Sequence, residues 1–237
     1  MIDGRRVLAV ITARGGSKSL PRKNLRLMAG KSLLAWTVEA AQGSRLINRL
    51  VLSSEDPEII RAAGELGCEA PFVRPRELAG DDVSAVDVVI HAIRELPGYD
   101  YVLLLQPTTP FRSASDIDNC IELCRREDAP AVISLAPVKK NPFWMFRLDE
   151  EGRLQPLIER EWENSQRQDL PEFYVINGGV YVARTDYLLE HGAFIGNRTL
   201  GYVMPEDRSL DIDTVEDLSY AEYLVSCGRG RQESDGR

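Results

Sequence analysis

Short apolar runs alternate along this chain with segments whose apolar residues recur three or four positions apart. The first pattern indicates buried strands, and the second indicates amphipathic helices. The predicted strands cover residues 7–13, 49–54, 101–106, 130–136, 177–184 and 200–205, with an extended piece at 68–74. The predicted helices cover residues 32–42, 56–66, 84–96, 113–127, 185–191 and 214–227. This alternation predicts an α/β fold with a mostly parallel central sheet flanked by helices.

The alternation breaks between residues 138 and 172. The stretches 143–148 and 153–158 surround the sequence "DEEG", which predicts a hairpin, and a polar stretch follows. We interpret residues 138–172 as an insertion into a single α/β domain formed by 1–137 and 173–227. The first strand of the predicted hairpin begins with "FWMF", residues 143–146. These side chains would expose more apolar surface than a free hairpin tolerates, so we expect a homodimer that buries them.

Composition limits the class of protein. At 237 residues with 43% hydrophobic content, the chain has room for one large domain. The four cysteines are too scattered for a disulfide framework or a structural zinc site, and we expect them to be buried and reduced. The first apolar run ends at Arg14 rather than at a cleavage site, and no run reaches membrane-spanning length, so we expect a cytoplasmic protein without a membrane span. Residues 228–237 are predicted to be a disordered tail.

Positive charge is concentrated near the start of the chain. The net charge of −8 argues against a general nucleic-acid binder, yet residues 1–31 hold eight Lys or Arg against one Asp, which leaves −15 on the remainder. Several of these cations lie in "ARGGSKSLPRKN", residues 13–24, directly after the first predicted strand. A cationic loop on an acidic protein indicates a local anionic ligand, most simply phosphates.

The loop has features suited to a polyphosphate. Gly15 and Gly16 would let backbone N–H groups approach the ligand, and Arg14, Lys18 and Lys23 would supply charge. In open α/β sheets, ligands lie beyond the carboxyl ends of the strands, where this loop is expected. The sequence contains neither G-x-G-x-x-G nor G-x-x-x-x-G-K-[ST] here, which excludes two common phosphate loops. The alternative interpretation is a solvated loop whose lysines aid solubility.

Two further stretches contain candidate ligand-binding residues. In "EDRSLDIDTVED", Asp211 and Asp213 flank Ile212, so on an extended segment they point to the same side and can share a divalent cation. Alternatively, Asp213 and Asp217 are only acids at the start of a helix. In "LLLQPTTPFR", a buried strand ends at Gln106, followed by a rigid polar turn, although Gln106 can instead be a buried and partnered amide. Both histidines are interpreted as structural.

Five motifs occur in order across nearly the whole chain. They are "ARGGSKSLPRKN" (13–24), "RPRELAGD" (74–81), "LLLQPTTPFR" (103–112), "RQ" with "NGGVY" (167–181) and "SLDIDTVED" (209–217). Together they resemble the acylneuraminate cytidylyltransferase family, the CMP-sialic acid synthetases and their bacterial relatives. The resemblance implies a Rossmann-like nucleotidyltransferase fold and transfer of CMP from CTP to the anomeric hydroxyl of a nine-carbon 2-keto sugar acid, with release of pyrophosphate. It further implies Mg²⁺, or Mn²⁺ in its place, and a homodimer whose insertion reaches the partner's site.

The resemblance also assigns residues. It places the CTP site on Arg14, Gly15, Gly16, Ser17, Lys18, Lys23, Asn24, Arg74 and Ser84, with Arg74 at cytosine and Ser84 near the base or ribose. It places the sugar acid on Gln106, Arg167 and Asn177, and the metal on Asp211 and Asp213. The residues expected to carry the reaction are Arg14, Lys18, Lys23, Asp211 and Asp213. No covalent enzyme intermediate is needed, because positioning and electrostatics supply most of the catalysis.

The chain departs from the family pattern on the acceptor side. Trp144 stands where some members have a basic residue, Val175 and Ile176 stand where some have Arg-Pro, and Ala85 replaces a second serine. Legionaminic and pseudaminic acids are therefore alternatives to N-acetylneuraminic acid. Three other functions stay open: a sugar-1-phosphate nucleotidyltransferase, a Kdo-activating enzyme and a catalytically silent nucleotide-binding regulator.

Overall fold

A six-stranded sheet forms the centre of the molecule in the computed structural model, which describes residues 4–158 and 169–229. Its strand order is β10-β6-β9-β5-β1-β4. These strands are β1 (Val7–Thr12), β4 (Arg49–Ser53), β5 (Tyr101–Leu105), β6 (Ala131–Pro137), β9 (Tyr174–Arg184) and β10 (Leu200–Val203). All neighbouring pairs are parallel except those of β9, which runs antiparallel to both β5 and β6. The prediction of a mostly parallel sheet is confirmed.

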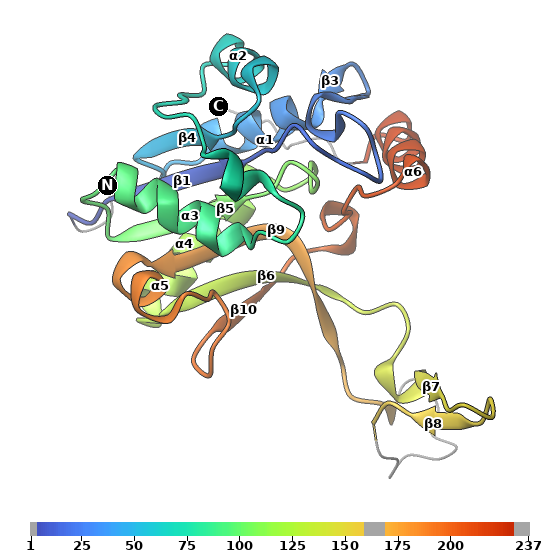
Figure 1. Ribbon diagram of the computed structural model, residues 1–237. Helices are drawn as coiled ribbons and strands as arrows, with labels where there is room; N and C mark the ends of the chain where they lie inside the picture. The colour runs from blue at the N-terminus through green and yellow to red at the C-terminus, as the bar shows by residue number, and fades with distance from the viewer. Residues whose placement is uncertain (1–3, 159–168, 230–237) are drawn as a thin grey trace.

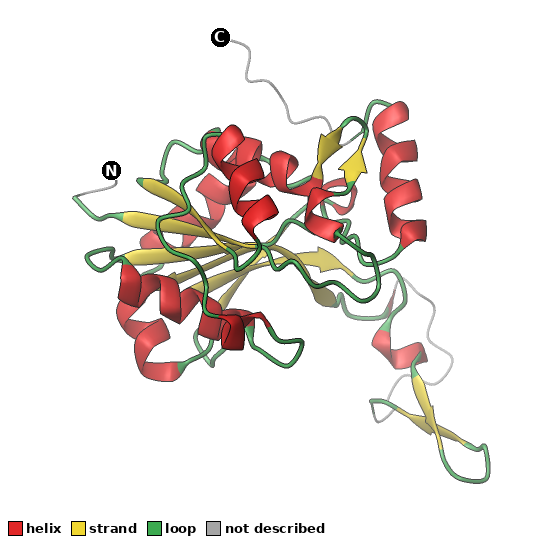
Figure 2. Ribbon diagram, turned by 45° about the horizontal axis from the view of Figure 1, so that its top comes forward, coloured by secondary structure: helices red, strands yellow, loops and turns green. Residues whose placement is uncertain are grey.

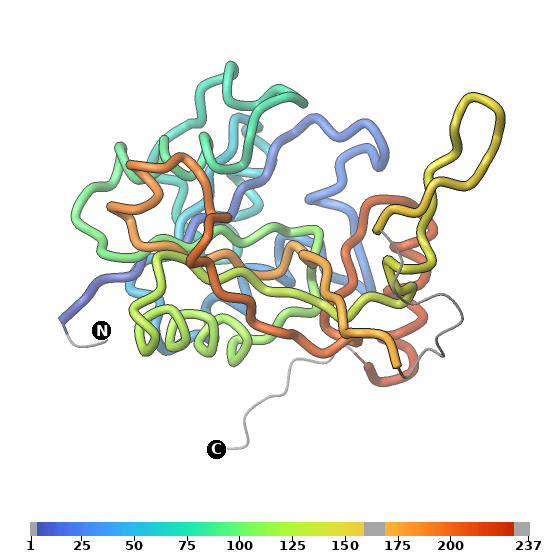
Figure 3. Tube along the Cα trace, turned by 90° about the horizontal axis from the view of Figure 1, so that it is seen from below, coloured from blue at the N-terminus to red at the C-terminus, as the bar shows by residue number. Residues whose placement is uncertain are grey.

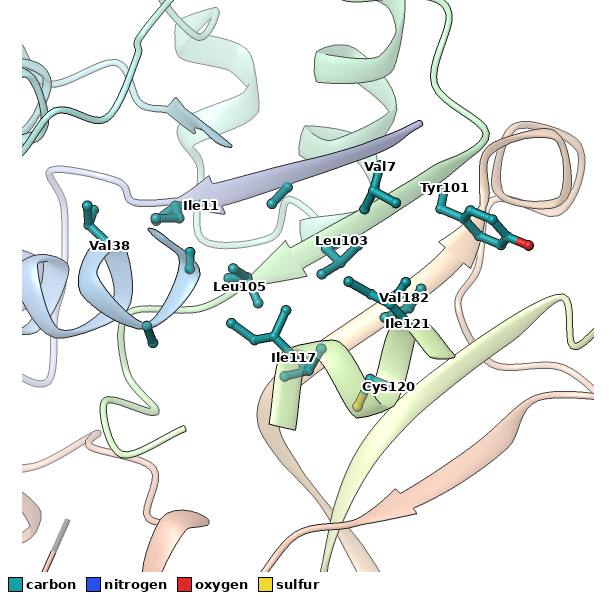
Figure 4. Close-up of a cluster of buried hydrophobic side chains, with 14 of the residues drawn as sticks. Val7, Ile11, Val38, Tyr101, Leu103, Leu105, Ile117, Cys120, Ile121 and Val182 are labelled. Atoms are coloured by element: carbon teal, nitrogen blue, oxygen red, sulfur yellow. The ribbon is translucent and has the colours of Figure 1, made fainter. Parts of the chain in front are cut away.

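Helices cover both faces of this sheet (Figure 2). They are α1 (Leu33–Gln42), α2 (Pro57–Glu65), α3 (Ala85–Glu95), α4 (Ala114–Arg126), α5 (Thr185–His191) and α6 (Val215–Ser226). Figure 4 shows one core cluster, in which Leu103 and Val182 of the sheet contact Ile117 and Ile121 of α4. A second cluster packs α3 and α5 on the opposite face. The strands β1, β5 and β6 are buried on both faces, which explains their continuous apolar runs, whereas the edge strand β10 is partly exposed.

The insertion begins where β6 and β9 extend beyond the sheet (Figure 1). Three strand positions of β9, starting at Tyr174, pair with the end of β6, so β9 begins before the predicted residue 177. The short helix η3 (Pro142–Trp144) follows, and β7 (Phe146–Leu148) pairs antiparallel with β8 (Leu154–Pro156). The predicted hairpin is thus confirmed, with shorter strands. We call residues 138–158 and 169–173 the arm.

Several local predictions need correction. The extended piece at 68–74 is not a strand, because only the isolated bridge between Val51 and Glu69 forms there. A small antiparallel pair, β2 (Leu27–Met28) with β3 (Lys31–Ser32), was not predicted. Cys68, Cys120 and Cys124 are buried as free thiols, but the prediction that all cysteines are buried is wrong, because Cys227 is exposed. The predicted disordered tail lies outside the described residues, apart from 228 and 229.

One end of the sheet collects the segments of chemical interest. Because β1, β4 and β5 are parallel, the loops that follow them meet at the same edge. Seen from below in Figure 3, the arm and α6 lie at this end of the molecule, opposite the N-terminus. Among residues 4–158 and 169–229, no helix combines the length and apolar character needed to span a bilayer.

Candidate active site

A pocket of about 550 Å³ opens at the carboxyl ends of β1 and β5. Nine of the residues predicted for the site line it: Arg14, Gly16, Ser17, Lys18, Lys23, Asn24, Arg74, Gln106 and Asp213. The segment from residue 74 to α3 adds an apolar wall formed by Leu78, Val83, Ala85 and Val88. The pocket therefore combines a cationic loop suited to phosphates with an apolar surface suited to a base. We call it the nucleotide pocket.

The cations of the loop are paired with carboxylates that come from elsewhere in the chain. Asp81 accepts Arg14 Nη1 at 2.8 Å and Lys18 Nζ at 2.5 Å, although the Lys18 side chain is 87% exposed. The hydrogen bond from Lys18 is the main cause that lowers the pKa of the Asp81 carboxyl. Lys23 Nζ donates to Asp213 Oδ1 at 2.8 Å. The two pairs of Asp81 are exposed and therefore weak in water, so a triphosphate can displace them, whereas the Lys23 side chain is only 14% exposed.

The loop after β1 is held in shape by local contacts. Leu20 is buried against α6 and α1, which anchors its middle. Arg22 adopts a left-handed φ of 58° before the short helix η1 (Lys23–Leu25), and its guanidinium pairs with Glu58. Asn24 is buried, and its Nδ2 donates to the carbonyl oxygen of Arg14 at 2.9 Å. Asn24 therefore supports the loop as well as lining the pocket.

Gly15 lies behind the pocket rather than on its lining. Its backbone N–H donates to Glu55 Oε1 at 2.7 Å, so that donor does not face a phosphate. A side chain at this position would place Cβ only 2.4 Å from Asp56 Oδ2. Glycine is needed here because the loop after β4 packs directly on the loop after β1. The sequence-based reason for Gly15, an approach of its N–H to phosphate, does not hold in this structure.

Besides Gly15, two described residues of the prediction, Ser84 and Asn177, do not line the nucleotide pocket, and Asp211 lines a neighbouring cavity. The Ser84 hydroxyl caps α3 by accepting from Val86 N, and its neighbour Ala85 reaches the pocket instead. Asn177 is buried, and its amide is occupied by hydrogen bonds with Ser134, Gly179 and Ser209. Arg167 lies outside the described residues. The structure therefore leaves Asn177 without a free polar group for a ligand.

Gln106 and Asp211 meet at a glycine. Gly178 has a φ of +73°, and a Cβ there would lie 2.9 Å from Gln106 Oε1, 3.1 Å from Thr109 Oγ1 and 3.9 Å from Asp211 Oδ2. The turn after β5 and the segment before α6 come this close only because residue 178 has no side chain.

Below the turn, the fully buried Arg112 donates to the carbonyl oxygen of Gln106 and, at 3.0 Å, to Thr37 Oγ1. Burial lowers the pKa of the Arg112 guanidinium to about 9, and the Asp211 and Asp116 carboxylates act against this shift. The group is charged at neutral pH. No ion pair within 4.0 Å joins Arg112 among the residues that the structure describes, so its charge acts on Asp211 through the protein interior. Arg112 thereby supports the turn that presents Gln106 and places positive charge behind it.

Asp211 and Asp213 flank the fully buried Ile212, as the alternation predicts. Ile212 N donates to the carbonyl oxygen of Thr108 at 2.8 Å, which fixes this segment to the turn after β5. Asp213 lines the nucleotide pocket, whereas Asp211 lines a neighbouring cavity of about 870 Å³ beside the arm. We call this second space the arm cavity. The two aspartates therefore stand where the two spaces adjoin.

The carboxylates fit a cation held jointly with a ligand. Desolvation raises the pKa of Asp211, the hydrogen bond with Thr108 lowers it, and the nearby Asp213 carboxylate raises it again. A cation would relieve this repulsion. In the described part of the chain, no three His, Cys, Asp or Glu side chains form a complete metal site. Mg²⁺ is suited to such a partial site, because it is commonly bound through one or two carboxylates plus substrate phosphates.

Sequence reasoning missed the acids that organise the pocket. Three carboxylates pair with cations in or near the pocket: Glu55 with Arg74, Asp81 with Arg14, and Asp116 with Arg208. Asp116 is buried and makes two contacts of 2.9 Å with Arg208. Their partners lie between 19 and 92 positions away along the chain. Only Asp81 had a signal, as the last residue of "RPRELAGD".

The chain is similar to known cytidylyltransferases. Residues 8–150 match the family model described as cytidylyltransferase. A CMP-N,N'-diacetyllegionaminic acid synthase from Legionella pneumophila is 34% identical over 94% of this chain and 98% of its own length. A pseudaminic acid cytidylyltransferase from Campylobacter jejuni is 32% identical over 92% of this chain and 95% of its length. An N-acylneuraminate cytidylyltransferase from Escherichia coli is 30% identical over 97% of this chain, but the match spans 54% of that protein.

A solved structure supports the fold. A CMP:2-keto-3-deoxy-manno-octonic acid synthetase complexed with CTP superimposes with a TM-score of 0.73 and 16% identity, over 94% of this chain and 99% of that one. The predicted Rossmann-like nucleotidyltransferase fold and the resemblance to the CMP-nonulosonic acid synthetases are confirmed. The chain belongs to the cytidylyltransferase family and is a nucleotidyltransferase.

Proposed function

We propose that this chain transfers CMP from CTP to the anomeric hydroxyl of a nine-carbon 2-keto sugar acid and releases pyrophosphate. The observation that carries this proposal is the meeting of two spaces at Asp211 and Asp213. One space is lined by the cations Arg14, Lys18 and Lys23, which suit a triphosphate. The other lies beside the arm and has room for an acceptor of this size.

We assign separate tasks to the chain's own residues. Arg14, Lys18 and Lys23 would exchange their carboxylate partners for the triphosphate, which neutralises charge on the leaving pyrophosphate. Gln106 would orient the acceptor hydroxyl for in-line attack on the α-phosphorus. Asp211 and Asp213 would hold Mg²⁺, or Mn²⁺, together with the phosphates. When bound, the cation supplies further charge neutralisation at the reacting phosphate.

The acceptor follows from the relatives and from the arm cavity. The similar proteins are named for diacetyllegionaminic, pseudaminic and N-acylneuraminic acids. In this chain, Met145, Val175 and Leu210 contribute apolar surface to the arm cavity. Lys139 and Lys140 contribute positive charge beside the carboxylate of Glu206, whose Oε1 lies 2.9 Å from Lys139 Nζ. An acylated sugar acid, with a carboxylate and apolar acyl groups, matches both features. We favour an acceptor of the legionaminic or pseudaminic type, with N-acetylneuraminic acid as the alternative.

We also propose a homodimer formed through the arm. The arm and the adjoining start of β9 expose large apolar side chains: Trp144, Met145, Phe146, Leu148, Leu154, Leu157, Tyr174, Val175 and Ile176. Figure 1 shows the β7–β8 hairpin standing away from the sheet, where the chain's own helices do not cover it. A contiguous apolar surface of this kind is typical of a protein interface.

A pyrophosphate-release screen tests the function. Purified chain with Mg²⁺ would receive CTP, UTP, ATP or GTP against legionaminic, pseudaminic, N-acetylneuraminic and 3-deoxy-manno-octulosonic acids and a set of sugar 1-phosphates. We expect release only with CTP and a nonulosonic acid. Comparable release with UTP, or preference for a sugar 1-phosphate, would contradict the proposal. CTP binding without release from any acceptor would favour a nucleotide-binding regulator.

A further inference from the structure

Glu55 occupies a position that none of the site assignments uses. It lies in the loop after β4, directly before Asp56, whose side chain caps α2. Its two carboxylate oxygens serve different segments. Oε1 accepts from the backbone N–H of Gly15 at 2.7 Å, and Oε2 accepts from Arg74 Nε at 3.2 Å and Nη2 at 2.5 Å. One side chain therefore connects the phosphate loop to the segment that forms the apolar wall of the nucleotide pocket.

Both partners are closely packed. A Cβ at Gly15 would overlap the side chain of Asp56, which would have to move. Arg74 is 4% exposed, and its backbone N–H donates to the carbonyl oxygen of Ser54 at 2.9 Å. The Glu55 side chain itself is 17% exposed. Burying a guanidinium without a charged partner is costly, and Glu55 is the carboxylate that pairs with Arg74 here.

The two partners belong to different ends of the nucleotide pocket. Gly15 sits between Arg14 and Gly16, which line the pocket beside Lys18. Arg74 lines it in the segment that also contributes Leu78 and Val83. The spacing between a cationic end and an apolar end must match the distance between the phosphates and the base of one nucleotide. A carboxylate hydrogen-bonded to both segments fixes that spacing.

We propose that Glu55 is a positioning residue that sets the phosphate loop and Arg74 in register for a single nucleotide. This inference rests on the proposed use of the pocket for CTP. Glu55 does not contact the ligand in this scheme and acts through Gly15 and Arg74. Its loss should therefore affect a ligand that spans both ends more than a ligand that occupies the phosphate end alone.

The test compares two ligands on matched variants. Isothermal titration calorimetry would measure binding of CTP and of inorganic tripolyphosphate, each with Mg²⁺, to the wild type, Glu55→Gln and Glu55→Asp. Glutamine keeps an acceptor for Gly15 but removes the charge from Arg74, whereas aspartate is too short to reach both. Glu69→Gln is the control, because Arg49 Nε and Nη2 contact Glu69 Oε2 at 3.2 and 2.7 Å, outside the nucleotide pocket.

We expect Glu55→Gln to weaken CTP binding at least about tenfold and tripolyphosphate binding less than about threefold, because the charged contact with Arg74 is lost but the loop keeps its acceptor. Glu55→Asp should weaken both ligands, and Glu69→Gln neither. In turnover assays, Glu55→Gln should raise KM for CTP more than it lowers kcat. Unchanged CTP binding, or an equal loss for both ligands, in a folded Glu55→Gln protein would overturn the proposal.

A second variant keeps the test usable if Glu55→Gln does not fold. Glu55→Gln combined with Arg74→Gln leaves no unpaired buried charge and should fold, bind tripolyphosphate and discriminate poorly between CTP and UTP. Wild-type affinity and selectivity for CTP in that protein would overturn the inference. Failure of the wild type to bind CTP would instead refute the proposed function, and it is measured first.

Discussion

The nucleotide pocket and the arm cavity are adjacent yet built in opposite ways. In the nucleotide pocket, every predicted cation already has a carboxylate partner from the same chain: Asp81 for Arg14 and Lys18, Asp213 for Lys23, and Glu55 for Arg74. The arm cavity is bordered by apolar side chains such as Met145 and Val175, both of which are exposed. One space is lined by groups that are paired within the chain, and the other is bordered by an exposed apolar arm.

This difference predicts that ligand binding in the two spaces depends on the oligomeric state in different ways. A pocket whose groups are fixed by contacts within one chain should bind its ligand whatever the oligomeric state. A cavity whose wall is an exposed apolar arm should depend on whatever covers that arm. Nucleotide binding and acceptor binding are thus expected to respond to different substitutions, even though Asp213 lines one space and Asp211, two positions away, lines the other.

The largest effect is expected where the two spaces meet. Asp211→Ala should lower kcat/KM by at least about a hundredfold, because it removes one of two carboxylates proposed to hold the cation at the reacting phosphate. The fold should survive, since Ile212, rather than Asp211, packs into the apolar core at this segment. Steady-state kinetics over a Mg²⁺ titration and circular dichroism would measure both. Near-wild-type activity under limiting Mg²⁺ would refute the metal assignment.

A smaller loss is expected inside the nucleotide pocket. Lys18→Ala should weaken CTP binding about ten- to a hundredfold, because it removes a charge-assisted contact to phosphate. Added Mg²⁺ should not restore it, since the lost charge belongs to the protein. Lys31→Ala is the matched control, because Lys31 also pairs with a carboxylate, Glu39, at 2.6 Å but lies outside the pocket. Equal losses in both variants would show that general electrostatics, not a site contact, is responsible.

The arm offers a way to disturb only one of the two spaces. Leu148 is 68% exposed on β7, and Leu148→Glu places a charge on the surface proposed to be buried between copies. We expect the dimer to weaken at least about tenfold, KM for the sugar acid to rise, and CTP affinity to stay unchanged. Analytical ultracentrifugation and calorimetry measure these. Ile195→Glu, at a site 62% exposed away from the arm, should change none of them. A loss of CTP affinity in Leu148→Glu would contradict the claim that the arm affects only the acceptor space.

The smallest effect concerns the internal charge pairs themselves. Asp81 has a lowered pKa because of Lys18, so its pairing adds stability above the ordinary aspartate pKa and loses it as the pH falls through the lowered value. Asp81→Asn should therefore lower Tm slightly at pH 7, and this difference should shrink as the pH falls through the lowered pKa of Asp81. CTP affinity should stay within about threefold of the wild type or improve, because the triphosphate no longer displaces a carboxylate.

The control for that prediction is Asp82→Asn, which changes the same net charge one position along the chain without removing the pair to Lys18. It should leave the pH dependence of Tm as in the wild type. A drop in CTP affinity beyond about tenfold in Asp81→Asn alone would assign Asp81 a direct role toward the ligand and contradict its interpretation as a displaceable partner.

Local patterning was sufficient for the elements of the fold. The buried run before Thr12 and the helices predicted at 113–127 and 214–227 depend on neighbours within a few positions. The structure shows all three, and it begins both helices with a capping box. The cationic loop was visible for the same reason, since its residues are contiguous. The side-by-side placement of Asp211 and Asp213 followed from the alternation around Ile212.

Only the tertiary structure decided which groups these residues face. Gly15 and Asn177 were expected to serve a ligand, but their polar groups are taken by Glu55 and by Ser134, Gly179 and Ser209. Glu55 and Asp81 become part of the site only because parallel strands bring the loops after β1 and β4 to one edge. A sequence lists charges but not their partners, because hydrogen bonds and ion pairs are set by distances that only the packed chain defines.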